Sequence, residues 1–70
     1  MQLSGANIKA RRLAAELTRE HVAVRMKRSC QTVQNWERDA FTPDARQLGE
    51  LADYLGCSVA DFYVAEEVMS

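Results

Sequence analysis

The sequence is poor in the residue types that build metal centres and disulfide frameworks. Its 70 residues include only two cysteines and one histidine. Cys30, Cys57 and His21 lie too far apart in the chain to provide the three or four spaced ligands of a structural zinc site. His21 also lacks a spaced nucleophile and an orienting acid, so catalysis is not expected. We therefore expect reduced thiols, no metal, no other cofactor and no enzymatic activity.

Long apolar runs are also missing. No stretch approaches the roughly 18 apolar residues of a membrane span, and the first residues lack the charged-then-apolar pattern of a secretory signal. With 47% hydrophobic and 27% charged residues, the composition is that of an ordinary globular protein. We expect one small cytoplasmic domain over residues 1–70, with no room for a separate ligand-sensing domain and no small-molecule ligand.

Charge is distributed unevenly along the chain. The net charge is −1, but residues 1–43 contain most of the basic side chains and residues 44–70 most of the acidic ones. A basic first half could lie on phosphates while the acidic half faces elsewhere. Such asymmetry is also common on solvated protein surfaces. Charge alone therefore does not decide between a nucleic-acid surface and an ordinary one.

Apolar periodicity and capping residues predict an all-α fold with five helices and no alternating strand pattern. The expected helices cover about 6–16, 19–26, 30–38, 43–55 and a short segment from 59. Thr18 and Ser29 suit the N-caps of the second and third helices, because a hydroxyl can accept a bond from an unpaired backbone N–H.

The fourth helix carries the clearest start and stop signals. Thr42 is expected as its N-cap with Pro43 at the first helical position, where proline loses no needed donor. Gly56 ends the helix. Ser58 followed by Asp61 approximates a capping box for the short fifth helix.

The third helix is expected to expose a polar face without charge. Val33 and Trp36 point inward at a spacing of three residues, which leaves Gln31, Gln34 and Asn35 outward. Asn and Gln amides donate and accept at once, so they can bond an adenine bidentately in the major groove of DNA. The alternative is that these amides form a solvated helix face with no partner.

The order of motifs from about residue 7 to residue 63 resembles the Cro and phage-repressor (XRE-type) helix-turn-helix family of DNA-binding regulators. The motifs that carry the resemblance are Leu17-Thr18, Ala23, Ser29, Asn35-Trp36-Glu37-Arg38, Pro43-Asp44 and Leu55-Gly56-Cys57-Ser58. The resemblance implies a compact five-helix repressor-like domain, with the motif at about 19–38 and the third helix in the major groove.

The resemblance also implies roles for individual residues. Base contacts fall on Gln31, Gln34 and Asn35, and on Cys30, whose position reaches bases in some members. Phosphate contacts fall on Arg19, Lys27, Arg28, Ser29, Thr32, Arg38 and Thr42. Arg12 is expected to form a structural ion pair with Glu37. For Cys30, at a helix N-terminus near Arg28, an alternative role is that of a redox-sensitive thiol.

Two places depart from the family pattern. The corner between the two motif helices usually holds glycine and an aliphatic residue, and this chain has Lys27 and Arg28. A lysine in left-handed geometry costs on the order of 1 kcal/mol. Asp39 likewise replaces a usual glycine, although aspartate tolerates this geometry better than most residues.

The expected partner is a double-stranded DNA operator, bound by a homodimer. A pseudo-palindromic site would then have half-site centres about 34 Å apart. The expected dimer surface consists of Val59, Phe62, Tyr63, Val64, Val68 and Met69, and residues 64–70 form a tail or dimerisation segment that could instead fold back onto the core. The alternative function is a protein-interaction module on the same fold, such as an antitoxin or a regulatory subunit.

Overall fold

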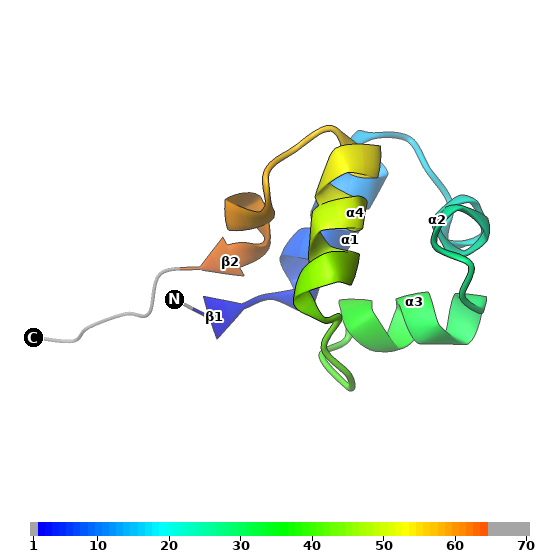
Figure 1. Ribbon diagram of the computed structural model, residues 1–70, viewed down its shortest axis with the longest axis horizontal. Coiled ribbons are helices and arrows are strands. Elements are labelled where there is room, and N and C mark those ends of the chain that lie inside the picture. Colours follow the sequence, from blue (N-terminus) through cyan, green and yellow to red (C-terminus); the bar gives the residue numbers. More distant parts are fainter. Residues whose placement is uncertain (1, 65–70) are drawn as a thin grey trace, which may run out of the picture.

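A computed structural model of the chain describes residues 2–64, and four α-helices form most of it (Figure 1). A short 3₁₀ helix and two strands of two residues each complete the described part. The elements are β1 (Gln2–Leu3), α1 (Gly5–Ala14), α2 (Arg19–Met26), α3 (Cys30–Glu37), α4 (Ala45–Leu55), η1 (Val59–Phe62) and β2 (Tyr63–Val64). No helix in this part of the chain is long and apolar enough to cross a membrane.

The two central helices begin where the sequence predicts. Thr18 caps α2 by accepting a bond from the His21 backbone N–H, and the His21 ring accepts one from the Thr18 N–H in return. The histidine thus completes a capping box, a role usually taken by Glu or Gln. Ser29 caps α3 by accepting from the Thr32 N–H at 3.2 Å. α2 ends at Met26, so only residues 27–29 separate it from α3.

The start of α4 differs from the prediction. Asp44, not Thr42, is the N-cap: its carboxylate accepts from the Gln47 N–H at 2.8 Å, and Gln47 accepts from the Asp44 N–H. Pro43 therefore precedes the cap instead of opening the helix. The reason is that Asp44 and Gln47 satisfy two backbone donors reciprocally, which a Thr42 cap could not do.

The prediction of five α-helices and no strands is also wrong. The fifth segment is a single 3₁₀ turn of four residues, Val59–Phe62. The chain becomes extended at Tyr63 because β2 pairs with β1 in antiparallel register, Gln2 opposite Val64 and Leu3 opposite Tyr63. In Figure 1 this small sheet lies at the end of the molecule opposite α2. Strands of two residues are too short to show an alternating pattern.

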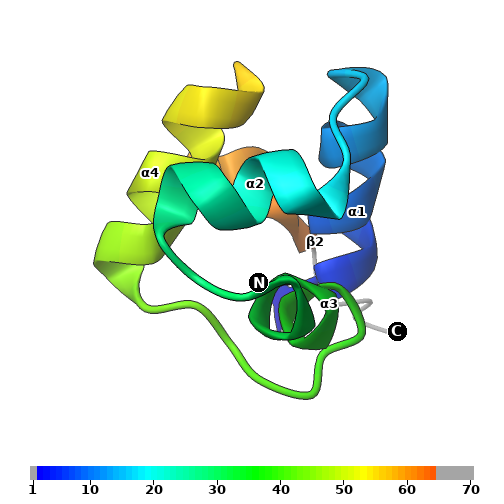
Figure 2. The ribbon, with the colours of Figure 1, turned by 90° about the vertical axis from the view of Figure 1, so that its right-hand side faces the viewer.

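One hydrophobic core joins all the helices. Ala23 on α2 is buried where α2 approaches α3, and Trp36 of α3 packs into the same cluster. Figures 1 and 2 show that α2 and α3 cross, since each view that shows one of them from the side shows the other nearly end-on. The remaining buried core residues are Ile8, Val22, Met26, Val33, Leu48, Leu51, Ala52, Leu55 and Phe62. The core holds one face of α3 and leaves the other to solvent.

The first turn of α1 lies against the end of α3. A Cβ on Gly5 would collide with the backbone of Trp36 and Glu37, so glycine is required for this approach. The Gly5 N–H donates to the Asp39 carboxylate at 2.8 Å. Asp39 itself is left-handed, with φ 63°. The aspartate that replaces a usual glycine thus has a structural role, because it accepts a bond from the first N–H of α1, next to the Ser4 cap.

Candidate nucleic-acid interface

The outer face of α3 is polar and open to solvent. Gln31, Gln34 and Cys30 are exposed, and Val33 and Trp36 on the opposite face are buried. Asn35 is half-buried, and its side-chain oxygen accepts a bond from the Gln31 amide at 3.2 Å. This bond uses one N–H of Gln31, so that side chain can still present its oxygen and its second N–H to a base.

An open groove connects this face to the start of α2. Arg19 and Glu20, from the first turn of α2, line it together with Cys30, Gln31 and Gln34 of α3. Two of the roles predicted from the sequence therefore meet on one surface: side chains suited to base edges lie beside a cation suited to a phosphate. The groove is open to solvent, as a surface for a large ligand must be.

Three charged side chains form a network at the wall of this groove, in which Arg12 and Glu37 are buried and Arg19 is partly exposed. The Glu37 carboxylate accepts from Arg12 Nε and Nη2, so the expected ion pair is present, and Arg12 Nη1 donates to the Leu17 carbonyl at 2.8 Å. Arg19 Nε also donates to Glu37, at 3.0 Å. This third member was not foreseen, because Arg19 and Glu37 lie on different helices and no spacing rule relates them.

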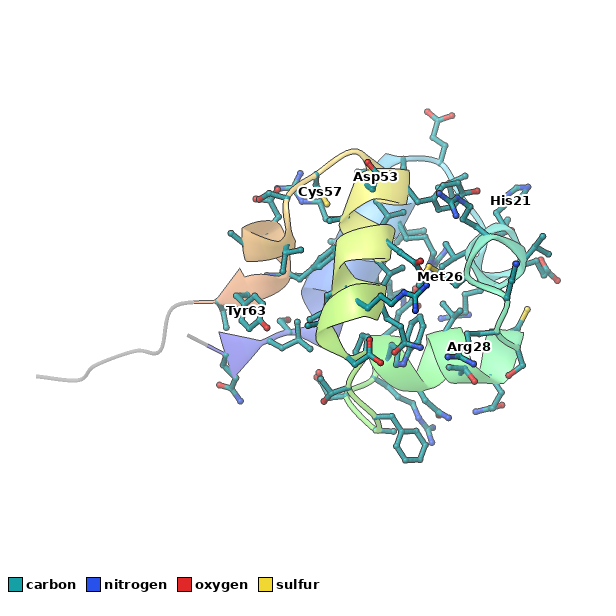
Figure 3. All side chains as sticks on the ribbon, in the orientation of Figure 1. His21, Met26, Arg28, Asp53, Cys57 and Tyr63 are labelled. Atoms are coloured by element: carbon teal, nitrogen blue, oxygen red, sulfur yellow. The ribbon has the colours of Figure 1, made fainter. Side chains whose placement is uncertain are left out.

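The turn between α2 and α3 adds positive charge. Lys27 is left-handed, with φ 57°, and is exposed, as is Arg28. Figure 3 shows Arg28 beside α3, and shows His21 on the outer side of α2 away from α3. The hydroxyls of Ser29, the cap of α3, and Thr32 lie 3.1 Å apart. Lys27 and Arg28 line a second hollow, with Arg46 of α4.

The loop after α3 carries the remaining predicted phosphate contacts. Arg38 and Thr42 are both exposed in it. Between them Phe41 is 64% exposed, which is unusual for a large apolar side chain. The N–H groups of Ala40 and Phe41 donate to the Asn35 carbonyl, which fixes the loop to the end of α3. Phe41 was not predicted as a site residue from the sequence, although an aromatic residue in a polar loop is an unusual feature.

Only part of the predicted dimer surface is exposed to solvent. Phe62 is fully buried in the core and cannot contact a second subunit, because η1 turns its ring inward between α1 and α4. Val59 and Tyr63 are partly buried against the core, and Val64 in β2 is 40% exposed. Val68 and Met69 lie outside the described residues.

A helix-turn-helix family model matches residues 8–62 of the chain. The chain belongs to this family. Its type is the XRE type expected from the sequence, a group of DNA-binding regulators. The matched residues include most of α1 and the whole of α2, α3 and α4, and therefore every residue that lines the groove.

One solved structure with this helix-turn-helix fold is titled "Crystal structure of transcriptional regulator from Listeria innocua". The two chains share 23% sequence identity, and the TM-score is 0.78. The alignment covers 100% of this chain and 68% of the Listeria chain. At this identity the likeness concerns the fold. No curated protein sequence matches the chain.

The two thiols occupy different surroundings. Cys30 is exposed at the start of α3, and Cys57 is partly buried after α4. Burial raises the pKa of the Cys57 thiol, with Arg11 lowering it and Asp61 raising it to smaller extents. Among residues 2–64, no group of three His, Cys, Asp or Glu side chains is placed to hold a metal ion.

Proposed function

We propose that this protein is a sequence-specific transcriptional regulator that reads duplex DNA with α3 in the major groove. The observation that carries the proposal is the groove in which Arg19 borders Cys30, Gln31 and Gln34. An amide-lined helix face beside a cation matches the division of DNA recognition into base contacts and phosphate contacts. Family membership supports the same conclusion.

Flanking cations extend this surface on both sides of α3. Lys27 and Arg28 precede the helix, and Arg38 follows it with Thr42. Phosphate contacts of this kind fix the orientation of a protein on DNA without selecting sequence. We infer that Asn35 orients Gln31 through their side-chain bond, so that the two amides act as one reading unit. The proposed role is that of a repressor or Cro-like protein.

We propose further that the protein acts as a homodimer on a pseudo-palindromic operator. Val64, with the partly buried Val59 and Tyr63, lies at the end of the molecule that carries the small sheet. Two copies joined at that end could present their α3 helices to half-sites about 34 Å apart. The stoichiometry on a selected duplex tests this arrangement.

Selection from random duplexes at modest salt tests the proposed function. Enrichment of a symmetric motif is expected, and its absence would favour the protein-interaction module instead. Gln31→Ala should then reduce discrimination at one operator position by about 1–3 kcal/mol, whereas Arg19→Ala should weaken all sequences alike. Lys9→Ala is the matched control for Arg19→Ala, because the Lys9 side chain is exposed outside α3 and its groove. Equal effects of Gln31→Ala on operator and random DNA would remove the base-reading role.

A further inference from the structure

The Glu37 carboxylate holds two guanidinium groups that differ in how completely they are satisfied. Arg12 is buried and has a protein acceptor for each of its three nitrogen atoms: Nε and Nη2 bond Glu37, and Nη1 bonds the Leu17 carbonyl. Three of the five N–H groups of Arg12 are thus bonded within the protein, one on each nitrogen. These bonds join α1 to the end of α3 and to the residue before the α2 cap.

Arg19 has the opposite arrangement. Its Nε donates to Glu37 Oε1 at 3.0 Å, and its side chain is 39% exposed, against 3% for Glu37. Among residues 2–64, its two terminal nitrogens have no protein acceptor. A guanidinium is planar and rigid, so a bond at Nε restricts where both terminal NH₂ groups lie. These groups border the groove beside α3.

The charges of the network point to the same side chain. One carboxylate and two guanidinium groups carry a net charge of +1, and Arg12 is buried inside the protein. Arg12 makes two bonds to the carboxylate and Arg19 makes one, so the excess positive charge lies toward Arg19, at the edge of the groove that Glu20 also lines. We propose that Glu37 is a positioning residue that fixes Arg19 before DNA arrives, so that its terminal NH₂ groups meet a phosphate. Holding the side chain in advance lowers the entropy lost on binding.

This inference rests on the proposed function. It predicts that replacing Glu37 changes DNA affinity in the direction opposite to that expected from charge alone. Replacing a carboxylate close to DNA by a neutral amide should, by charge alone, strengthen binding to phosphates. Loss of positioning should weaken it. Glu37→Gln is therefore expected to bind DNA severalfold more weakly, although it removes a negative charge. Arg19→Gln, which removes the phosphate contact itself, is expected to lose about tenfold.

A double-mutant cycle on a selected duplex tests the proposal. Dissociation constants are measured for the wild type, Arg19→Gln, Glu37→Gln and the double variant, at a temperature where circular dichroism shows each to be folded. In the Arg19→Gln background, Glu37→Gln should cause no further loss. Equal losses in both backgrounds, or tighter binding by Glu37→Gln alone, would overturn the inference. Failure of the wild type to bind any duplex would instead overturn the proposed function.

A second measurement uses the unmodified protein, because Glu37→Gln disturbs a buried pair and could unfold the domain. Nuclear magnetic resonance reports how fast each arginine Nε–H exchanges with water. Arg12 and Arg19 should both exchange slowly in the free protein. Arg46 is the control, since it is 89% exposed and lies 3.9 Å from its carboxylate neighbour. Arg19 exchanging as fast as Arg46 would show that it is not held in advance, and the proposal would be wrong.

Discussion

Lys27 occupies the left-handed C-cap of α2, with φ 57° and ψ 44°, and its replacement by glycine separates the stability of the corner from its binding role. The strain of a Cβ in this geometry is on the order of 1–2 kcal/mol. Part of the gain is offset, because glycine is more disordered in the unfolded chain. We expect Lys27→Gly to raise the free energy of unfolding by about 0.5–1 kcal/mol, or Tm by roughly 2–8 °C.

The same substitution removes an exposed cation beside α3. Affinity for a duplex should fall. The plot of log K against log salt should become shallower, its negative slope losing about 0.9 in magnitude, if Lys27 neutralises one phosphate. Thermal denaturation followed by circular dichroism gives the first quantity, and fluorescence anisotropy at several salt concentrations gives the second. The variant is therefore expected to be more stable and to bind more weakly.

Glu16→Gly is the matched control. Glu16 is also exposed and left-handed, with φ 61°, but it lies in the α1–α2 connection, which Figure 1 shows on the side of the molecule away from α3. Replacing Glu16 by glycine should raise Tm by a similar amount without weakening DNA binding. The reasoning is refuted if Lys27→Gly lowers Tm, or if both variants weaken DNA binding equally.

Three further predictions concern the glycines, Asp39 and the two thiols. Gly5→Ala should destabilise the domain by about 1–3 kcal/mol in urea unfolding, because its Cβ meets backbone, whereas Gly49→Ala, with open space around it, should stabilise α4 by up to about 1 kcal/mol. Asp39→Ala should lower stability by about 1–2 kcal/mol through loss of the bond to the Gly5 N–H, and Asp39→Asn should restore most of it in the same assay. Iodoacetamide should modify Cys30 before Cys57 as pH rises, since burial and a raised pKa leave less reactive thiolate at Cys57; equal rates by mass spectrometry would contradict this.

The helices that bear the site could be predicted from sequence because their signals are local. Thr18 and Ser29 each cap through a bond to a residue three positions on, so a short window contains the whole signal. The start of α4 was predicted at the wrong residue because the local signal was ambiguous. Two acceptable caps, Thr42 and Asp44, stand close together, and only the reciprocal bond with Gln47 decides between them.

The features that sequence reasoning missed depend on contacts between distant segments. The sheet of β1 and β2 joins the two ends of the described chain through two residues each, with no periodicity to detect. Gly5 is required by the backbone of α3, which lies more than thirty positions away in sequence. Arg19 was expected at a phosphate on family grounds, but its bond to Glu37 follows from how α2 crosses α3, which only the folded structure shows.

The network of Arg12, Glu37 and Arg19 consists of charged side chains, which requires a physical explanation. A buried ion pair contributes little net stability, because desolvation offsets most of the attraction, and apolar side chains of similar volume often hold helices together as well. Joining α1 to the end of α3 therefore does not by itself require the Arg12–Glu37 pair. Apolar residues at both positions could fill the same space but could not accept a bond from Arg19. The carboxylate is best explained by the partner it holds at the groove, and the packing of α1 follows as a second use of the same group.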